Sequence, residues 1–341
     1  MKFGPIPLDQ AEGKILGHNV AGRDGRRALR KGSAITADDI KLLRELGRAV
    51  VYVADLEVGD IGEDEAADRI SRIAAGEGLR RSKARTGRVN FLAGAQGVLR
   101  VDRPALDRLN SYEGITLATR RSNFPVEAGK ITATLKIIPY ALPEFTVAEI
   151  ERTAPKPPLM RIEPLRARKV GLIFSSSPEA QDRVRNTFEG PLRGRIKDLG
   201  SQVEVVACVA LEDEAGEAAL ADLLAGMVSD RIEMIILAGE TAIMDRNDIA
   251  PRAVDRAGGR VECVGVPVDP GNLLMIAYLG QVPILGAPGC ARSRKVNVID
   301  WVLPRLLVGE ALSKEHLIEM GDGGLLEDTL LRPNPRTPSD G

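Results

Sequence analysis

The second half of the chain alternates between short apolar runs and amphipathic runs, and this alternation is the strongest constraint on its fold. After Lys169 the run VGLIFSS is followed by the helical pattern PEAQDRVRNTFEGPLRGRIKDLG, the run VEVVACVAL, a second helical pattern and the run IEMIILAG. Strands that alternate with helices form parallel sheets, because each helix returns the chain to the same edge. We therefore predict an α/β domain over residues 169–312, with helices on both faces of a mainly parallel sheet.

The first 150 residues show a different pattern, in which short helical segments are mixed with short β-branched runs. Thr36 and the acid three residues later form a capping-box pattern that opens a helix, and Gly47 ends it. Gly, Asn and Pro separate the strand-like runs between residues 89 and 138. This mixture predicts a smaller α+β domain at 1–150, in one piece or as two subdomains.

Proline-rich composition marks two further segments. The stretch TAPKPPLMRIEPLRARK concentrates prolines and basic residues without helical periodicity, so we expect a linker at 151–168. The end of the chain is rich in Gly and Pro, and it cannot bury enough apolar area to offset the entropy lost on ordering. We expect a C-terminal tail at 313–341.

Composition excludes several classes of function. Hydrophobic residues make up 44% and charged residues 28% of the 341 residues, as in ordinary globular proteins. Lys plus Arg number 47 and Asp plus Glu 48, and only 3% of residues are aromatic, so we expect no nucleic-acid partner. Three separated cysteines and the lack of a long apolar run predict a cytoplasmic protein with neither a disulfide framework nor a membrane span.

Polar loops follow three of the apolar runs, and each loop is a candidate anion site. Ligands of parallel sheets bind beside the carboxyl ends of the strands, where helix N-termini offer free amides. The first loop, Ser175–Ser177, offers three hydroxyl groups after the run VGLIF. It binds an anion or, in the alternative interpretation, only caps the following helix.

The second loop follows the apolar run MIILA and contains residues suited to a phosphate and a hard cation. Gly239 allows close backbone approach, and Thr241 can donate a hydrogen bond to a phosphate. Asp245 or Asp248 can hold Mg²⁺ through carboxylate oxygen. In the alternative interpretation, Asp248 only caps the next helix.

The third loop, Gly286–Ser293, ends a strand and opens the last helix, which we expect over about 292–307. The basic sequence RSRK, from Arg292 onward, would then occupy the first turn, where cations oppose the helix dipole and a bound anion relieves the conflict. Cys290 is either a reactive thiol, if the dipole lowers its pKa, or a small packing residue. The turn Pro270–Gly271 approaches the same pocket or is a simple β-turn.

These landmarks, in this order, resemble the molybdopterin-binding domain shared by molybdopterin adenylyltransferase and molybdopterin molybdenumtransferase. In that family a Gly-Gly-Thr/Ser loop leads to an Asp, a Gly-Gly turn leads to a strand, and a Pro-Gly turn and a Leu-Pro-Gly-Asn-Pro loop precede the last helix. The counterparts here are Gly239–Thr241, Asp248, Gly258–Gly259, Pro270–Gly271 and Pro288–Gly289. The resemblance covers about residues 169–309, and the segment LRKGSAITADDIKLLRELGRAVVYV also resembles the element that precedes this domain in the molybdenumtransferase.

The resemblance implies a three-layer α/β/α molybdopterin-binding domain that holds the pterin phosphate across these loops. It implies that molybdopterin or its adenylylated form is the ligand or substrate, with Mg²⁺ and a nucleotide taking part in the enzymes' reactions. It implies catalytic roles for Asp248 and Asp245, with Asp248 beside the metal. The implied ligand-binding residues are Ser175, Ser176, Ser177, Gly239, Glu240, Thr241, Pro270, Gly271, Pro288, Gly289, Cys290, Arg292 and Ser293.

Three departures from the family pattern leave two main hypotheses open. Glu240 replaces the second Gly, Ser175–Pro178 replaces a Thr-Gly-Asp-Glu loop, and Cys290–Ala291 replaces Asn-Pro. The first hypothesis is a transferase of molybdenum cofactor biosynthesis, which transfers a nucleotide or inserts molybdenum. The second is a non-catalytic carrier or sensor that works with a molybdenum-cofactor nucleotidyltransferase. Hydrolysis of another nucleotide is a third hypothesis, and a homo-oligomer is expected because parallel sheets with exposed helices often self-associate.

Overall fold

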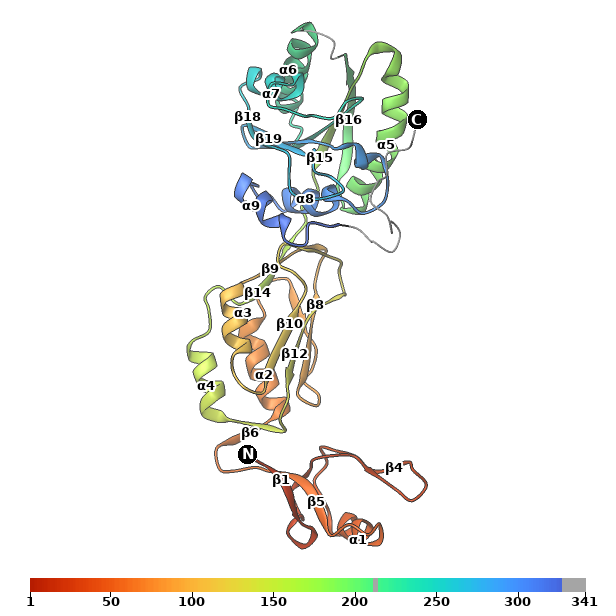
Figure 1. Ribbon diagram of the computed structural model, residues 1–341. Helices are drawn as coiled ribbons and strands as arrows, with labels where there is room; N and C mark the ends of the chain where they lie inside the picture. Colours follow the sequence, from red (N-terminus) through yellow and green to blue (C-terminus); the bar gives the residue numbers. More distant parts are fainter. Residues whose placement is uncertain (211–213, 327–341) are drawn as a thin grey trace. The chain divides into compact units, whose positions relative to one another are not determined.

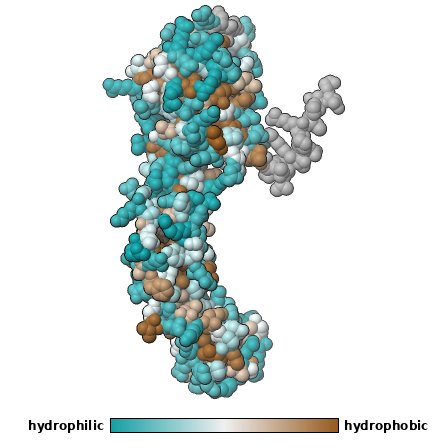
Figure 2. All heavy atoms as spheres, turned by 60° about the vertical axis from the view of Figure 1, so that its left-hand side comes forward, coloured by the Kyte–Doolittle hydropathy of each residue, from teal (hydrophilic) through white to brown (hydrophobic). Residues whose placement is uncertain are grey.

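The structure is a computed structural model that describes residues 1–210 and 214–326. The chain divides into two compact units, the first spanning Met1–Glu163 and the second beginning at Pro164. Both units combine sheets and helices, which confirms the predicted mixed α/β character (Figure 1). Hydrophilic side chains dominate the face of the molecule seen in Figure 2, and apolar ones are scattered between them. No helix in the described ranges is long and apolar enough to cross a bilayer.

The first 55 residues of the first unit form a small sheet with one helix. Their strands and helix are β1 (Lys2–Pro7), β2 (Ile15–Leu16), β3 (Val20–Ala21), β4 (Arg27–Leu29), α1 (Ala37–Glu45) and β5 (Val50–Asp55). The strand order is β1-β5-β2, and β3 pairs with β4. Thr36 and Asp39 form the predicted capping box at the start of α1. Leu43 of α1 packs with Val51 and Val53 of β5 in a core of its own.

The rest of the first unit surrounds a larger core. Its elements are β6 (Asp60–Gly62), α2 (Glu63–Ala74), β7 (Leu79–Arg81), β8 (Arg88–Ala93), β9 (Gly97–Val101), α3 (Arg103–Asn110), β10 (Ile115–Thr119), β11 (Pro125–Val126), β12 (Ile131–Ile137), β13 (Ala141–Pro143), α4 (Glu144–Arg152) and β14 (Met160–Pro164). The main sheet has the order β10-β12-β8-β7. Ala66, Ile70 and Ala74 lie one helical turn apart and bury one face of α2 in this core.

The segment 151–168, for which the sequence predicts a linker, contains a strand. Met160–Pro164 forms β14 beside β9, and the side chains of Met160 and Ile162 are buried. The backbone N–H of Ile162 donates to the carbonyl of Glu77 at 2.9 Å. Alternation of buried and exposed residues over 160–164 is the normal pattern of a half-buried strand, and the flanking prolines hid it in the sequence.

The second unit is built on one six-stranded sheet. Its elements are β15 (Lys169–Ser175), α5 (Gln181–Asp198), β16 (Gln202–Val209), α6 (Glu214–Ser229), β17 (Met234–Gly239), α7 (Ile249–Arg256), β18 (Arg260–Val264), β19 (Met275–Leu279), β20 (Val282–Gly286), α8 (Val298–Leu307) and α9 (Lys314–Ile318). The strand order is β16-β15-β17-β20-β19-β18. The first four strands in this order pair in parallel, and β19 pairs antiparallel with both of its neighbours, β20 and β18.

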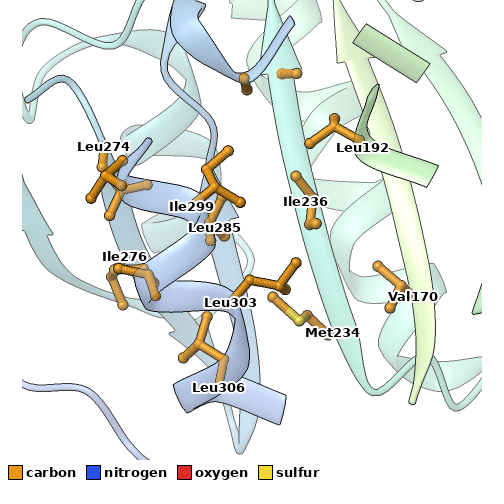
Figure 3. Packing of buried hydrophobic residues seen from close by; sticks show 14 of the residues in the cluster. Val170, Leu192, Met234, Ile236, Leu274, Ile276, Leu285, Ile299, Leu303 and Leu306 are labelled. Carbon is orange, nitrogen blue, oxygen red and sulfur yellow. The ribbon is translucent and has the colours of Figure 1, made fainter. Parts of the chain in front are cut away.

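Alternate residues of the central strands bury the two faces of this sheet. Val170 and Leu172 pack with residues of α5 and α8 on one face, as Figure 3 shows for Val170, Leu192 and Leu303. Ile173 and its neighbours from β17 pack with α6 and α7 on the opposite face. Strands buried on both faces read as continuous apolar runs, which is why VGLIF and MIILA were recognisable in the sequence.

Part of the segment predicted as a tail, 313–341, belongs to the core instead. Ser313 caps α9, and the side chains of Leu317 and Met320 join the cluster between the sheet and α8. The apolar residues of this segment are few but regularly spaced, and the surrounding Gly residues concealed them. The remaining residues, 327–341, lie outside the described residues.

A buried tyrosine gives this unit a pH dependence. The hydroxyl of Tyr278 accepts a hydrogen bond from Leu312 N at 2.7 Å, and burial raises the pKa of Tyr278 from 10.0 to about 12. The unfolded chain therefore loses this proton first as pH rises, and the tyrosine's contribution, complete below pH 10, disappears by about pH 12.

We expect the free energy of unfolding of the wild type to fall by about 2–3 kcal/mol more than that of Tyr278→Phe between pH 10 and pH 12. Urea unfolding at a series of pH values measures how the free energy of unfolding of each protein changes with pH. Parallel slopes for the two proteins would contradict the assigned environment of Tyr278.

Candidate functional site

The three predicted loops leave the same edge of the sheet. β15, β17 and β20 are neighbours that pair in parallel, and Ser175 is opposite Gly239 while Leu237 is opposite Gly286. Ser175 O accepts a hydrogen bond from Glu240 N at 2.9 Å. The loops at 175–177, 239–248 and 286–293 therefore begin side by side, at the carboxyl ends of their strands.

The first loop holds a buried hydroxyl group that has no partner. Ser175 and Ser176 are buried, and the Oγ of Ser176 makes no hydrogen bond within the described residues. Ser177 precedes the short 3-10 turn at 178–180, yet its side chain does not cap that turn. The alternative of a capping series is therefore wrong for Ser177. An unpaired buried hydroxyl costs about 1–3 kcal/mol and is expected where a ligand or water completes the site.

Glu240 binds donors of the first loop. Its Oε2 accepts hydrogen bonds from Ser177 N at 3.2 Å and from Ser177 Oγ at 3.1 Å, and its Oε1 pairs with Arg183. The N–H and hydroxyl of Ser177, together with the Arg183 guanidinium, hold the pKa of Glu240 below its ordinary value. Gly239 is required beside it, because a Cβ at this position would lie 2.5 Å from Ser175 Oγ. A carboxylate thus occupies donors of the kind that bind a phosphate.

Asp245 and Asp248 stabilise the second loop rather than forming a ready metal site. Asp248 Oδ2 accepts hydrogen bonds from Met244 N at 2.6 Å and from Asp245 N at 3.0 Å. Asp245 Oδ1 accepts from Asn247 N at 2.8 Å, and this backbone bond is the main reason that the pKa of Asp245 is lowered. Asp248 stands at the N-cap position of α7 without capping it through its side chain.

The second loop offers carboxylates, but no closed set of protein ligands, to the Mg²⁺ that the family resemblance implies. Over the residues described, no three His, Cys, Asp or Glu side chains gather closely enough to hold a metal ion. Mg²⁺ is usually held by one or two carboxylates together with waters and substrate phosphates, so Asp248 stays the predicted ligand. We derive no step through a metal.

The last helix begins later than the sequence predicts. Gly289–Arg292 forms a short 3-10 turn, and α8 starts at Val298 after the cap residue Asn297. Arg292 and the two basic residues that follow Ser293 therefore precede the helix, and the predicted conflict between these cations and the helix dipole is wrong. Asp300 in the first turn of α8 completes a capping box with Asn297 and suits the dipole.

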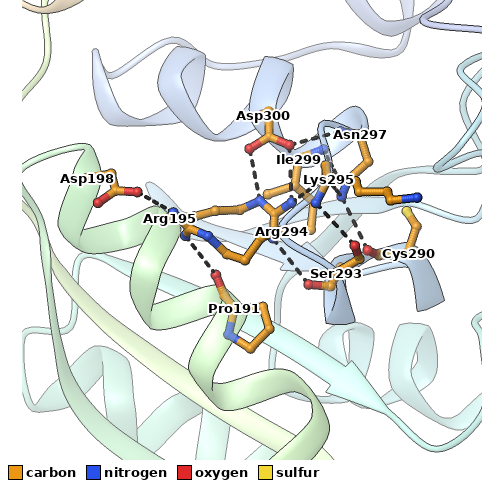
Figure 4. Close-up of polar contacts among 11 residues, drawn as sticks. Pro191, Arg195, Asp198, Cys290, Ser293, Arg294, Lys295, Asn297, Ile299 and Asp300 are labelled. Carbon is orange, nitrogen blue, oxygen red and sulfur yellow. Dashed lines mark hydrogen bonds and ion pairs between the residues drawn. The ribbon is translucent and has the colours of Figure 1, made fainter. Parts of the chain in front are cut away.

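Arg195 is a structural residue of this site that the sequence analysis missed. Its guanidinium is buried and donates to Asp300 Oδ1 at 2.9 Å, to Lys295 O at 2.8 Å and to Ala291 O at 3.3 Å (Figure 4). It therefore fixes the loop before α8 to helix α5. The signal in the sequence was an arginine at an apolar position of α5, beside Ile196.

The remaining predicted residues of the third loop differ in their surroundings. Cys290 is half-buried, and burial raises the pKa of its thiol, which is opposite to the lowering that the reactive-thiol alternative requires. Arg292 is exposed, and its side chain has no hydrogen bond or ion pair with other described residues. Ser293 Oγ accepts from Lys295 N at 3.1 Å. Arg292 is thus a cation that remains available at the edge of the sheet.

The turn Pro270–Gly271 packs against the start of α8. Val298 N donates to Pro270 O at 3.3 Å, and a Cβ on Gly271 would lie 2.2 Å from Val298 Cγ1. Gly271 has a φ of +132°, which other residues adopt at a cost. The turn supports the third loop and is not a free β-turn. Thr241, Pro288 and Gly289 all lie in the loops at this edge, and Pro288 is buried.

Comparison with known proteins gives one family match, in the first unit. A model described as Domain of unknown function (DUF8806) matches residues 5–55. A search among curated proteins finds no match to this sequence.

Several solved structures of molybdopterin biosynthesis proteins are similar to the chain at low identity. The enzyme MoaB from Thermus thermophilus is 16% identical, with 42% of this chain and 98% of that chain covered and a TM-score of 0.31. The MoeA protein from Pyrococcus horikoshii is 12% identical, with 90% and 75% covered and a TM-score of 0.31. The Mog protein from Mycobacterium ulcerans is 16% identical, with 41% and 93% covered and a TM-score of 0.27. We base the functional proposal on residues of this chain.

Removal of the Arg195 side chain should destabilise the second unit strongly. We expect Arg195→Met to lower the free energy of unfolding by about 3–5 kcal/mol, because Asp300 and two carbonyls lose their buried partner. Arg193→Met is the matched control on the same helix, since Arg193 forms an exposed pair with Glu189, and its cost should stay below about 1 kcal/mol. Urea unfolding measures both, and equal costs would contradict the role of Arg195.

Two glycines of the site should respond differently to alanine. We expect Gly271→Ala to cost at least about 2 kcal/mol, because of its positive φ and its contact with Val298. Gly289→Ala has no atom within 4 Å of the added Cβ and should stay within about 0.5 kcal/mol of the wild type. Thermal and urea unfolding of both variants test this, and a tolerated Gly271→Ala would refute the packing described for the turn.

Proposed function

We propose that the second unit binds molybdopterin, or its adenylylated form, through the phosphate at the carboxyl edge of the sheet. We further propose that the protein serves molybdenum cofactor biosynthesis as a carrier or sensor, together with a nucleotidyltransferase partner. The observation that carries the proposal is that the three loops with the predicted landmarks begin side by side at one edge, and that the first of them holds the unpartnered hydroxyl of Ser176. That placement supports an anion site, because neutral and cationic donors are concentrated there.

The donors at this edge are suited to a phosphate monoester. Ser176 Oγ has no partner in the described structure, and the guanidinium of Arg292 is exposed and unpaired there. Thr241 is exposed in the second loop. Hydroxyl groups and an arginine fork donate to phosphate oxygen, and hydrogen bonds to a charged acceptor contribute more than neutral ones.

The arrangement favours binding over group transfer. Phosphoryl and nucleotidyl transfer require groups that neutralise charge as it develops in the transition state. Asp245 and Asp248, for which catalysis was predicted, accept backbone hydrogen bonds within their own loop. The loop Ser175–Pro178 contains no acid. Donors alone are enough to hold a ligand, so a carrier or sensor requires the fewest further groups.

Glu240 competes with the ligand in this proposal. Its carboxylate holds Ser177 and Arg183, which are donors that a phosphate would use. Two anions at one set of donors repel each other, so a phosphate binds when the Glu240 side chain moves aside. The side chain of Glu240 is 30% exposed and Arg183 is 69% exposed, so this movement does not require the core to open.

The direct test is equilibrium binding of molybdopterin and of adenylylated molybdopterin to the full-length protein, with chemical analysis of the recovered ligand. We expect saturable binding and recovery of unchanged ligand. Conversion of the ligand would support the transferase hypothesis in place of the carrier, and absence of binding to both forms would overturn the proposal.

Replacement of Glu240 tests the competition. We expect Glu240→Gln to bind molybdopterin about two- to fivefold more tightly, because an exposed ion pair of this kind contributes up to about 1 kcal/mol. Glu189→Gln is the matched control, since it removes the same charge from a surface ion pair within α5, and its affinity should equal that of the wild type. Weaker binding by Glu240→Gln would show that the carboxylate assists the ligand instead.

A further inference from the structure

A cavity lies at the edge of the same sheet opposite to the candidate site, beside the amino ends of β15 and β17. Its volume is about 550 Å³, within the range of small-molecule sites. Its walls come from the start of β15, the turn before β18, the β19–β20 turn and the segment after α8. They include Arg166, Arg168, Glu233, Met234, Arg260, Glu262, Tyr278, Pro283, Leu306, Gly309 and Glu310.

The carboxylates of this cavity already have partners. Glu233 accepts from Arg168 Nη1 at 3.0 Å and from Lys169 N at 3.0 Å. Glu262 pairs with Arg260, and Glu310 pairs with the buried Arg305. These acids are therefore neutralised by neighbouring cations and do not leave the cavity negative.

Arg166 lines the cavity, and its guanidinium group has no carboxylate partner among the described residues. Its side chain has no ion pair or hydrogen bond among the described residues, although its backbone N–H donates to Leu307 O at 3.2 Å. A Cβ placed on Gly309 would lie 3.5 Å from Nη1 of Arg166 and 3.5 Å from Nη2 of Arg168. The two guanidinium groups thus converge on the same short stretch of backbone. Two cations this close repel each other unless an anion lies between them.

Two backbone N–H groups in the wall of the cavity already have partners. Gly309 N donates to Leu306 O at 3.0 Å, and Gly259 N donates to Val254 O at 2.9 Å. Arg166 therefore offers a cationic donor without an acid, and a guanidinium group can donate two hydrogen bonds to one carboxylate or phosphate. Met234, Pro283 and Leu306 add apolar wall, which suits the carbon part of a ligand.

We propose that this cavity binds a small organic oxyanion, a carboxylate or a phosphate, through Arg166 and Arg168. The cavity is separate from the candidate site, because the two lie at opposite ends of β17. Met234, the first residue of β17, lines the cavity, whereas the candidate site begins at Gly239, the last residue of this strand. The inference does not depend on molybdopterin binding.

The experiment titrates full-length ¹⁵N-labelled protein at low ionic strength with inorganic phosphate and, separately, with malonate, and follows the amide signals of Gly309 and Gly259. We expect saturable shifts of these signals with at least one anion, and the stronger of the two identifies the oxyanion class. Arg166→Gln should weaken this binding roughly tenfold, because it removes a charge-assisted donor. Arg292→Gln is the matched control at the other edge and should leave the Gly309 shifts unchanged.

A second variant is expected to act in the opposite direction. Glu233→Gln frees Arg168 from its carboxylate and retains an oxygen for Lys169 N, so the anion should bind about two- to fivefold more tightly. Thermal unfolding of each variant checks that the fold persists. Absence of shifts with both anions, shifts that persist unchanged in Arg166→Gln, or weaker binding by Glu233→Gln would overturn the proposal.

Discussion

The parallel pairing of β15 with β17 and of β17 with β20 is the constraint on which the second unit depends. Ile235 and Ile236 face opposite clusters, so a shift of one residue in β17 would exchange the residues of both cores. The register is therefore strongly determined. Because the pairing is parallel, the register also determines where the loops leave the sheet, and segments distant in the sequence must meet at one edge.

Sheet hydrogen bonds do not reach the loop before α8. The buried guanidinium group of Arg195 holds this loop in place instead. Arg195 comes from an apolar stripe of α5 and binds two carbonyls of the loop together with Asp300 of α8. A buried charge is costly unless it is paired and hydrogen-bonded, and here three residues accept hydrogen bonds from the guanidinium group. The position of the third loop therefore depends on helix packing as well as on β20, and Gly271 packs closely against Val298 at the start of α8.

Periodicity in the sequence predicted the elements that bury continuous apolar runs, and it failed where burial depends on distant contacts. The runs at β15 and β17 are strands, and Thr36 caps α1 as expected. The sequence predicted a linker where β14 lies and a tail where α9 lies. Each segment has few apolar residues, and these stabilise it only by packing against cores formed by distant parts of the chain. The roles of Asp245 and Asp248 were equally hidden, since a carboxylate that accepts loop amides has the same spacing as one that binds a metal.

Glu240 links the departure from the family pattern to the proposed role. A glycine at this position would leave Ser177 and Arg183 free for a ligand, whereas in the proposed role the carboxylate competes for these donors and would lower the affinity. Because the Glu240 side chain is partly exposed, it can move into water. In the proposed role it therefore weakens the binding of the ligand without preventing it. A carrier must release its ligand unchanged, and an internal anion that returns to the same donors promotes that release.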